Sequence, residues 1–166
     1  MEQPANKILN NISRMDDNAL SRLFGNAQDL LIKNSQNSDA KLVLDAVEKE
    51  WEKRLSEFKF GNYKASTPET GILSSVGYKV GNDGAKPKVR RQRLDHIMSG
   101  TLPPVGSPAY MAEWGHKLSL QRYQKLHRVI RVLASSGQTL GNMDKAVSEW
   151  EDDLIYLEEH WKKQIE

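Results

Sequence analysis

Apolar residues recur every three or four positions along much of the chain, which is the period of an amphipathic α-helix. In the first third, such stripes fall within residues 20–31 and 44–58, and the polar run 34–38 separates them. Two helices joined by a connection of about five residues are expected to lie antiparallel as a hairpin. Asp16 and Asp17 are candidate N-caps of the first helix, and Ser38 is the candidate for the second.

Prolines and glycines divide the middle of the sequence into shorter predicted helices. Residues 67–69, Thr-Pro-Glu, combine a capping hydroxyl, a proline and an acid, and so predict a helix that ends at Gly77. A basic helix is expected over residues 87–99. Residues 107–108, Ser-Pro, repeat the start signal and predict one or two turns that end at Gly115.

Two longer apolar stripes follow in the last third of the sequence. Ser119 is expected to cap a helix, residues 135–142 to form a loop, and Met143 to lie near the start of the final helix. The apolar stripe of the final helix is a heptad seam with 3-4-3-4 spacing: Val147, Trp150, Leu154, Leu157 and Trp161. A seam this short favours packing against the rest of the protein, with a coiled coil as the alternative.

The sequence therefore predicts an all-α fold of five to seven helices. We expect an N-terminal helical hairpin at residues 1–60, a basic helical module at residues 67–137, and an acidic amphipathic C-terminal helix at residues 138–166 that packs on the rest. A chain of 166 residues is long enough to bury one core, so a single compact domain is the alternative.

Several classes of site are absent from the sequence. The chain has no cysteine, which excludes disulfides and thiolate zinc sites. It begins without the pattern of a signal peptide, and its apolar runs are far shorter than the ~20 residues of a membrane span. We therefore expect a cytoplasmic protein with no metal, no cofactor, no catalytic motif and no membrane partner. The histidines show no metal-ligand spacing: His96, His116, His127 and His160.

Charge is strongly segregated along the chain. Residues 61–137 carry 12 Lys/Arg and 4 Asp/Glu, whereas residues 138–166 carry 3 and 8. Basic helical faces are the expected electrostatic signature of a protein that binds nucleic-acid phosphates. We therefore predict a non-enzymatic protein that binds or associates with DNA or RNA. The predicted phosphate contacts are Lys86, Arg90, Arg93, Arg122, Lys125 and Arg128.

These contacts require the cations to face outward. We expect Lys86, Arg90 and Arg93 to share one helix face at i, i+4 and i+7, opposite the apolar Leu94 and Ile97. Two alternatives stay open. The acidic final helix could neutralise the basic helices inside the fold, or residues 143–165 could bind a protein partner or a second copy of the chain.

Two pairs, Arg91 with His96 and Arg122 with His127, fit the pattern R-x4-H. This pattern resembles the RNase motif of the all-α HEPN superfamily. The resemblance covers only these residues, and the polar residue that the family favours after its arginine is matched by Gln92 but not by Tyr123. It implies a second alternative function, a small RNase with an arginine holding phosphate and a histidine transferring protons.

Overall fold

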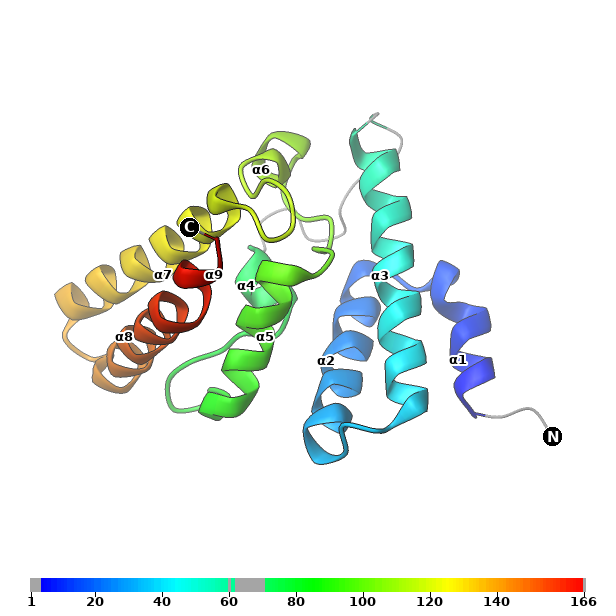
Figure 1. Ribbon diagram of the computed structural model, residues 1–166, viewed down its shortest axis with the longest axis horizontal. Coiled ribbons are helices and arrows are strands. Elements are labelled where there is room, and N and C mark those ends of the chain that lie inside the picture. Colours follow the sequence, from blue (N-terminus) through cyan, green and yellow to red (C-terminus); the bar gives the residue numbers. More distant parts are fainter. Residues whose placement is uncertain (1–3, 60, 62–70, 166) are drawn as a thin grey trace. The chain divides into compact units, whose positions relative to one another are not determined.

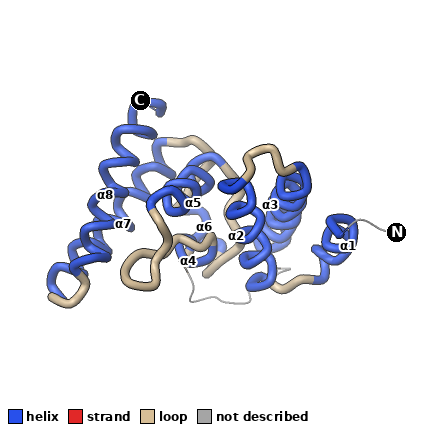
Figure 2. The backbone as a smooth tube through the Cα atoms, turned by 90° about the horizontal axis from the view of Figure 1, so that it is seen from below, coloured by secondary structure: helices blue, strands red, loops and turns tan. Residues whose placement is uncertain are grey.

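The computed structural model describes residues 4–59, 61 and 71–165. These residues confirm the predicted all-α class, because they form helices α1 to α9 and no strand (Figures 1 and 2). The predicted count of five to seven helices was too low, since short helices form at both ends of the chain. The start signal at residues 67–69 lies outside the described residues.

The chain divides into two compact units that alternate along the sequence. Unit 1 comprises residues 1–77 and 101–111, and unit 2 comprises residues 78–100 and 112–166. The range 67–137 predicted from its basic composition contributes residues to both units. We describe each unit by itself.

Unit 1 is built around the predicted N-terminal hairpin. Its helices α2 and α3 run side by side in opposite directions (Figure 1). Of the two predicted caps, Asp16 caps α2 by accepting a hydrogen bond from the Ala19 amide at 2.7 Å, and Asp17 is the first residue of the helix. Asn37 takes the capping role expected of Ser38, because its side chain accepts from the Ala40 amide at 3.0 Å. The helices are α1 (Pro4–Asn11), the 3₁₀ turn η1 (Ile12–Arg14), α2 (Asp17–Lys33), α3 (Ser38–Lys59) and α4 (Ile72–Ser75).

The core of unit 1 combines aromatic packing with a buried arginine. Phe24 and Trp51 are fully buried, and their ring centroids lie 5.0 Å apart. Arg54 is 5% exposed and donates to Asp17 at 3.0 Å, to Glu50 at 2.9 Å and to the Met15 carbonyl. Because a buried cation needs charged and polar partners, these contacts fix the start of α2 against α3.

Unit 2 contains a basic helix and a second helical hairpin. α5 (Pro87–Ser99) has the predicted bounds. α6 (Pro108–Ala112) crosses the boundary between the units, and α7 (Leu120–Leu140) begins at the predicted cap, where Ser119 accepts from the Arg122 amide at 3.1 Å. The C-terminal segment forms α8 (Asp144–Leu157), the π-helical turn η2 (Glu158–Lys162) and α9 (Lys163–Ile165).

α7 and α8 lie side by side in both views (Figures 1 and 2). The loop predicted at residues 135–142 was placed too early, because α7 continues to Leu140 and ends at Gly141 in the left-handed conformation. Gly137 permits the close approach, since a Cβ there would lie 2.8 Å from Val147 Cγ2. The predicted seam packs inside unit 2, with four members buried: Val147, Trp150, Leu157 and Trp161.

Candidate functional site

The six predicted phosphate contacts differ sharply in exposure. Arg90, Arg93 and Arg122 are only 1%, 3% and 6% exposed. Lys86 and Arg128 are exposed, and Lys125 is half-buried. Unit 2 therefore uses half of the predicted set inside its own fold and leaves the other half at or near its surface.

Arg90 forms the centre of a buried ionic network between α5 and α8. Its Nε donates to Asp153 at 2.8 Å, Nη2 donates to the same carboxylate at 3.3 Å, and Nη1 donates to Glu149. Nη1 also donates to the Ala85 carbonyl at 2.9 Å. The two-pronged contact with Asp153, itself 1% exposed, is the geometry that guanidinium and carboxylate favour.

The same carboxylates hold the turn that precedes α5. The Tyr78 hydroxyl donates to Asp153 at 2.6 Å, and the Gly81 amide donates to Glu149 at 2.9 Å. Burial acts to lower the pKa of Arg90, but Asp153 and Glu149 outweigh it and the pKa is raised. Burial and the charge of Asp153 raise the pKa of the Tyr78 hydroxyl far above its ordinary value. At this point the acidic final helix neutralises the basic helix within the fold.

The expectation that Arg90 and Arg93 face outward was wrong, and helical spacing explains the error. Arg90 lies four residues before Leu94, and Arg93 lies four residues before Ile97. Residues four apart share a helix face, so the pattern places both arginines with the apolar residues and not opposite them. The structure buries all four side chains.

Arg122 is also part of the fold, and its partners are carbonyl oxygens. Its guanidinium donates to Ile97 at 3.2 Å and Gly100 at 2.9 Å, at the end of α5. It also donates to Trp114 at 3.4 Å and Gly115 at 2.8 Å, in the turn before α7. Burial lowers its pKa to about 10, so the group stays cationic at neutral pH.

The two R-x4-H pairs do not share one kind of environment. Arg122 is buried and bound to carbonyls, while His127 Nε2 lies 2.9 Å from a Glu158 carboxylate oxygen. The guanidinium of Arg91 lies 5.0 Å above the Tyr156 ring. A phosphate therefore has no access to the guanidinium of Arg122, which argues against the RNase alternative at that pair.

The outward face of α7 is a cationic surface of unit 2. We define this face as Gln124, Arg128, Arg131 and Ser135, which are exposed and spaced along one side of the helix. Lys125 lies beside it, 2.9 Å from Glu113 and 5.9 Å from the Trp114 ring centroid. No Asp or Glu occurs between Trp114 and Met143.

The outward face of α8, which we define to include the first two residues of η2, has the opposite charge. Ile155 is 51% exposed in its middle. Two of its acids contact α7, because Glu151 accepts from Gln138 at 2.9 Å and Glu158 pairs with His127. The face carries the exposed acids Asp144, Glu151, Asp152, Glu158 and Glu159.

An aromatic cluster surrounds Asp95 near the π-helical turn. The Tyr156 hydroxyl and Trp161 Nε1 donate to Asp95 Oδ1 at 2.7 and 2.8 Å. The ring of His160 stacks on Tyr156, with centroids 5.2 Å apart. Sequence reasoning missed this cluster, since neither Asp95 nor Tyr156 belongs to a motif. These hydrogen bonds connect α5, which carries Asp95, to α8 and η2, which carry Tyr156 and Trp161.

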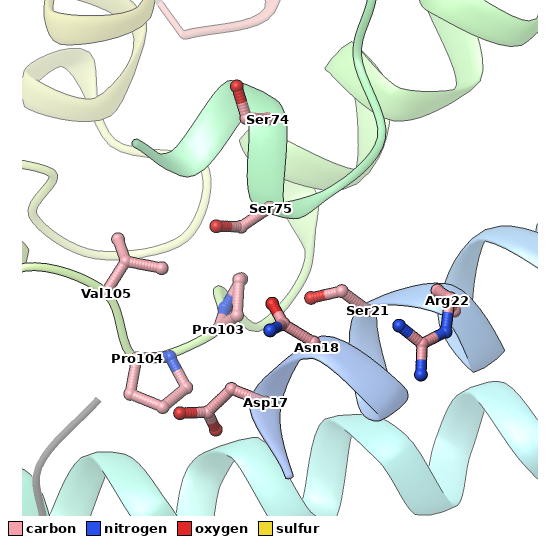
Figure 3. A pocket seen from close by; sticks show the side chains of 9 residues that line it. All are labelled: Asp17, Asn18, Ser21, Arg22, Ser74, Ser75, Pro103, Pro104 and Val105. Carbon is pink, nitrogen blue, oxygen red and sulfur yellow. The ribbon is translucent and has the colours of Figure 1, made fainter. Parts of the chain in front are cut away.

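Unit 1 contains a small cavity of about 180 Å³ (Figure 3). Ser21 of α2 and Ser74 and Ser75 of α4 line it, opposite Pro103 and Pro104. Ligand sites are usually roughly 300–1,000 Å³, so this volume suits a few water molecules better than an organic substrate.

The described residues contain no further site of two common kinds. No three His, Asp or Glu side chains there are grouped so that they could hold a metal ion. None of the helices described has the length and apolar character needed to cross a bilayer. In comparisons with known proteins, no family model, no curated protein and no solved structure matches the chain.

Proposed function

We propose that the protein binds nucleic acid without catalysing a reaction, and that it contacts phosphates through the outward face of α7. The supporting observation is the charge of this helix: its 21 residues include no acid, and Arg128 and Arg131 are exposed on the side away from the buried residues. Arginine suits phosphate because its planar guanidinium donates two hydrogen bonds at once.

Burial of three predicted arginines reduces the number of residues that can contact phosphate. Arg90, Arg93 and Arg122 serve the fold, so the phosphate contacts reduce to Arg128 and Arg131, with Lys125 beside them and Lys86 at the start of α5. The acidic face of α8 repels phosphates and so restricts their approach to the side of α7 that faces away from α8. The binding surface therefore runs from Gln124 to Ser135, which at 1.5 Å per residue is roughly 17 Å.

The test is fluorescence anisotropy with a labelled RNA and a labelled DNA duplex at about 50 and about 200 mM salt. Three neutralised phosphates predict an affinity roughly fortyfold weaker at the higher salt. The double variant Arg128→Glu/Arg131→Glu is expected to lose binding. Its matched control is Lys41→Glu/Lys53→Glu, which makes the same charge change at exposed positions of α3.

Two outcomes contradict the proposal. Absence of binding by the unmodified protein at low salt would exclude it. Equal losses in the α7 and α3 variants would show that net charge, and not the outward face of α7, governs the interaction.

A second candidate function is that of a protein–protein adaptor, favoured by the outward face of α8. Its acids surround the exposed Ile155, a combination that suits a partner segment carrying basic and apolar side chains. Self-association through the seam is disfavoured, because the seam is buried against α7. Light scattering checks this: a monomeric mass is expected.

A further inference from the structure

The turn before α7 holds a leucine in an unusual backbone conformation. Leu118 has a φ of 59°, which lies in the left-handed region that glycine and asparagine favour. Its side chain is 52% exposed, so packing in the core does not account for the choice of leucine. Strained positions of this kind cluster where a side chain must be held for a function.

The surrounding contacts fix this turn firmly. The Leu118 amide donates to the Met98 carbonyl at 2.8 Å, and the Ser119 hydroxyl donates to the His116 carbonyl at 2.7 Å. Arg122 anchors Gly115, three residues earlier in the turn, through the contact described above. The backbone that carries the exposed Leu118 side chain is therefore held in place by hydrogen bonds to α5 and α7.

A second exposed leucine stands close to it, at the start of the cationic helix. Leu120 is 50% exposed and is the first residue of α7. It lies four residues before Gln124 and eight before Arg128, so it continues the outward face toward the turn. The two leucines, which we call the leucine pair, thus stand at one end of the proposed phosphate-binding surface.

We infer that the leucine pair contacts bases of the nucleic acid whose phosphates lie on the outward face of α7. This inference rests on the proposed function. It adds contacts to the bases, which the cations that bind phosphates do not recognise. Apolar side chains beside cations are used in this way, because they insert between base steps and partly unstack them. The continuity of the leucine pair with an acid-free cationic helix favours a nucleic acid over an apolar protein partner.

The experiment uses RNA and DNA that carry 2-aminopurine, whose fluorescence rises when the base is unstacked. We expect the unmodified protein to raise this fluorescence on binding. The variant Leu118→Gly/Leu120→Gln is expected to bind about tenfold more weakly and to lose the rise. Glycine adopts the left-handed backbone without strain, so the first of these changes preserves the turn. Leu140→Gln, at a leucine 68% exposed at the other end of α7, is the control and is expected to behave like the unmodified protein.

The outcomes separate this inference from the proposed function. If the leucine variant binds as tightly as the unmodified protein with the same fluorescence rise, the inference is overturned and the proposed function stands. If the unmodified protein binds neither RNA nor DNA, both fail. Leucine-dependent sedimentation with phosphatidylserine vesicles, without any 2-aminopurine response, would overturn the inference in favour of a lipid surface.

Discussion

At the scale of single residues, arginine is used as a structural side chain in both units. Arg54 and Arg90 each face two carboxylates, and Arg122 faces four carbonyl oxygens. A buried guanidinium is costly unless its donors are bound, and the partners of each are arranged to bind them. Arg122 in addition binds the Ile97 and Gly100 carbonyls at the end of α5, where a helix leaves backbone carbonyls unpaired.

Replacement of Arg122 by lysine tests this role. A single ammonium cannot reach the four carbonyls that the planar guanidinium joins, so we expect Arg122→Lys to lower the free energy of unfolding by about 2–4 kcal/mol. Urea denaturation measures this change. Arg128→Lys is the control, since that exposed position is expected to change stability by less than about 0.5 kcal/mol. Equal losses of stability in Arg122→Lys and Arg128→Lys would contradict the structural role of Arg122.

The raised pKa of Tyr78 predicts a loss of stability at alkaline pH. The unfolded chain ionises this hydroxyl above pH 10.0, the ordinary value, while the folded protein keeps it protonated. The stabilisation is therefore complete well below pH 10 and is lost as the pH rises through that value, by about 1 kcal/mol between pH 10 and about pH 11.

Tyr78→Phe is the comparison that isolates this effect. Between pH 9 and about pH 11, the unfolding free energy should fall by about 1.4 kcal/mol more in the unmodified protein than in Tyr78→Phe. The lowered pKa of Arg122 also affects stability in alkaline solution. This contribution is the same in the unmodified protein and in Tyr78→Phe, so it cancels when their unfolding free energies are subtracted. Parallel pH profiles would show that Tyr78 ionises freely.

At the scale of elements, apolar spacing predicted α2, α3, α5, α7 and α8, and the caps Asp16 and Ser119 marked the starts of α2 and α7. α1 was missed, since its eight residues offer only a few apolar side chains. The bounds of α5 were predicted correctly while the direction of its arginines was not. Helical spacing already places these arginines on the apolar side of α5, but the sequence did not show their partners, because the carboxylates that bind Arg90 come from α8, some sixty positions away.

The close contact of α7 with α8 predicts the effect of a substitution at Gly137. Alanine normally stabilises a helix relative to glycine by about 1 kcal/mol. At Gly137 a Cβ would lie 2.8 Å from Val147 Cγ2 and 3.0 Å from Trp150 Cζ3, so we expect Gly137→Ala to destabilise unit 2 by about 1–3 kcal/mol.

Thermal melting followed by circular dichroism measures this effect. Ser136→Ala, at the neighbouring exposed position of the same helix, is the control and should raise the melting temperature slightly or leave it unchanged. If both substitutions stabilise the protein, the two helices are not packed as closely as the structure has them.

At the scale of the whole molecule, the two units are interleaved in sequence. The chain passes between them at residues 77–78, 100–101 and 111–112. Composition and periodicity could not predict this arrangement, because residues 102–108, with three prolines, resemble an exposed connector. In the structure Leu102 and Val105 are only 3% and 2% exposed. The candidate site was likewise predictable only in part: its helix and Arg128 were identified, but Leu118 belongs to no pattern.

Because unit 1 is formed by two separate stretches of the sequence, we expect residues 1–77 to be incomplete without residues 101–111. Thr101 donates through its amide to Glu48 and through its hydroxyl to Glu52, both at 2.9 Å. Burial of an aliphatic side chain contributes about 1.5–3 kcal/mol, so loss of Leu102 and Val105 removes about 3–6 kcal/mol. Because small domains are stable by only about 5–15 kcal/mol, we expect a fragment of residues 1–77 to lack a cooperative thermal transition.

A fragment of residues 1–111 provides the matched comparison, since it restores the segment and leaves out α7 and α8. It should melt cooperatively, and Leu102→Ala/Val105→Ala within it should abolish that transition. Circular dichroism and amide hydrogen exchange on α2 and α3 report the result. Equal protection of these helices in the two fragments would mean that the N-terminal hairpin is stable alone, and that residues 101–111 lie on a core already complete without them.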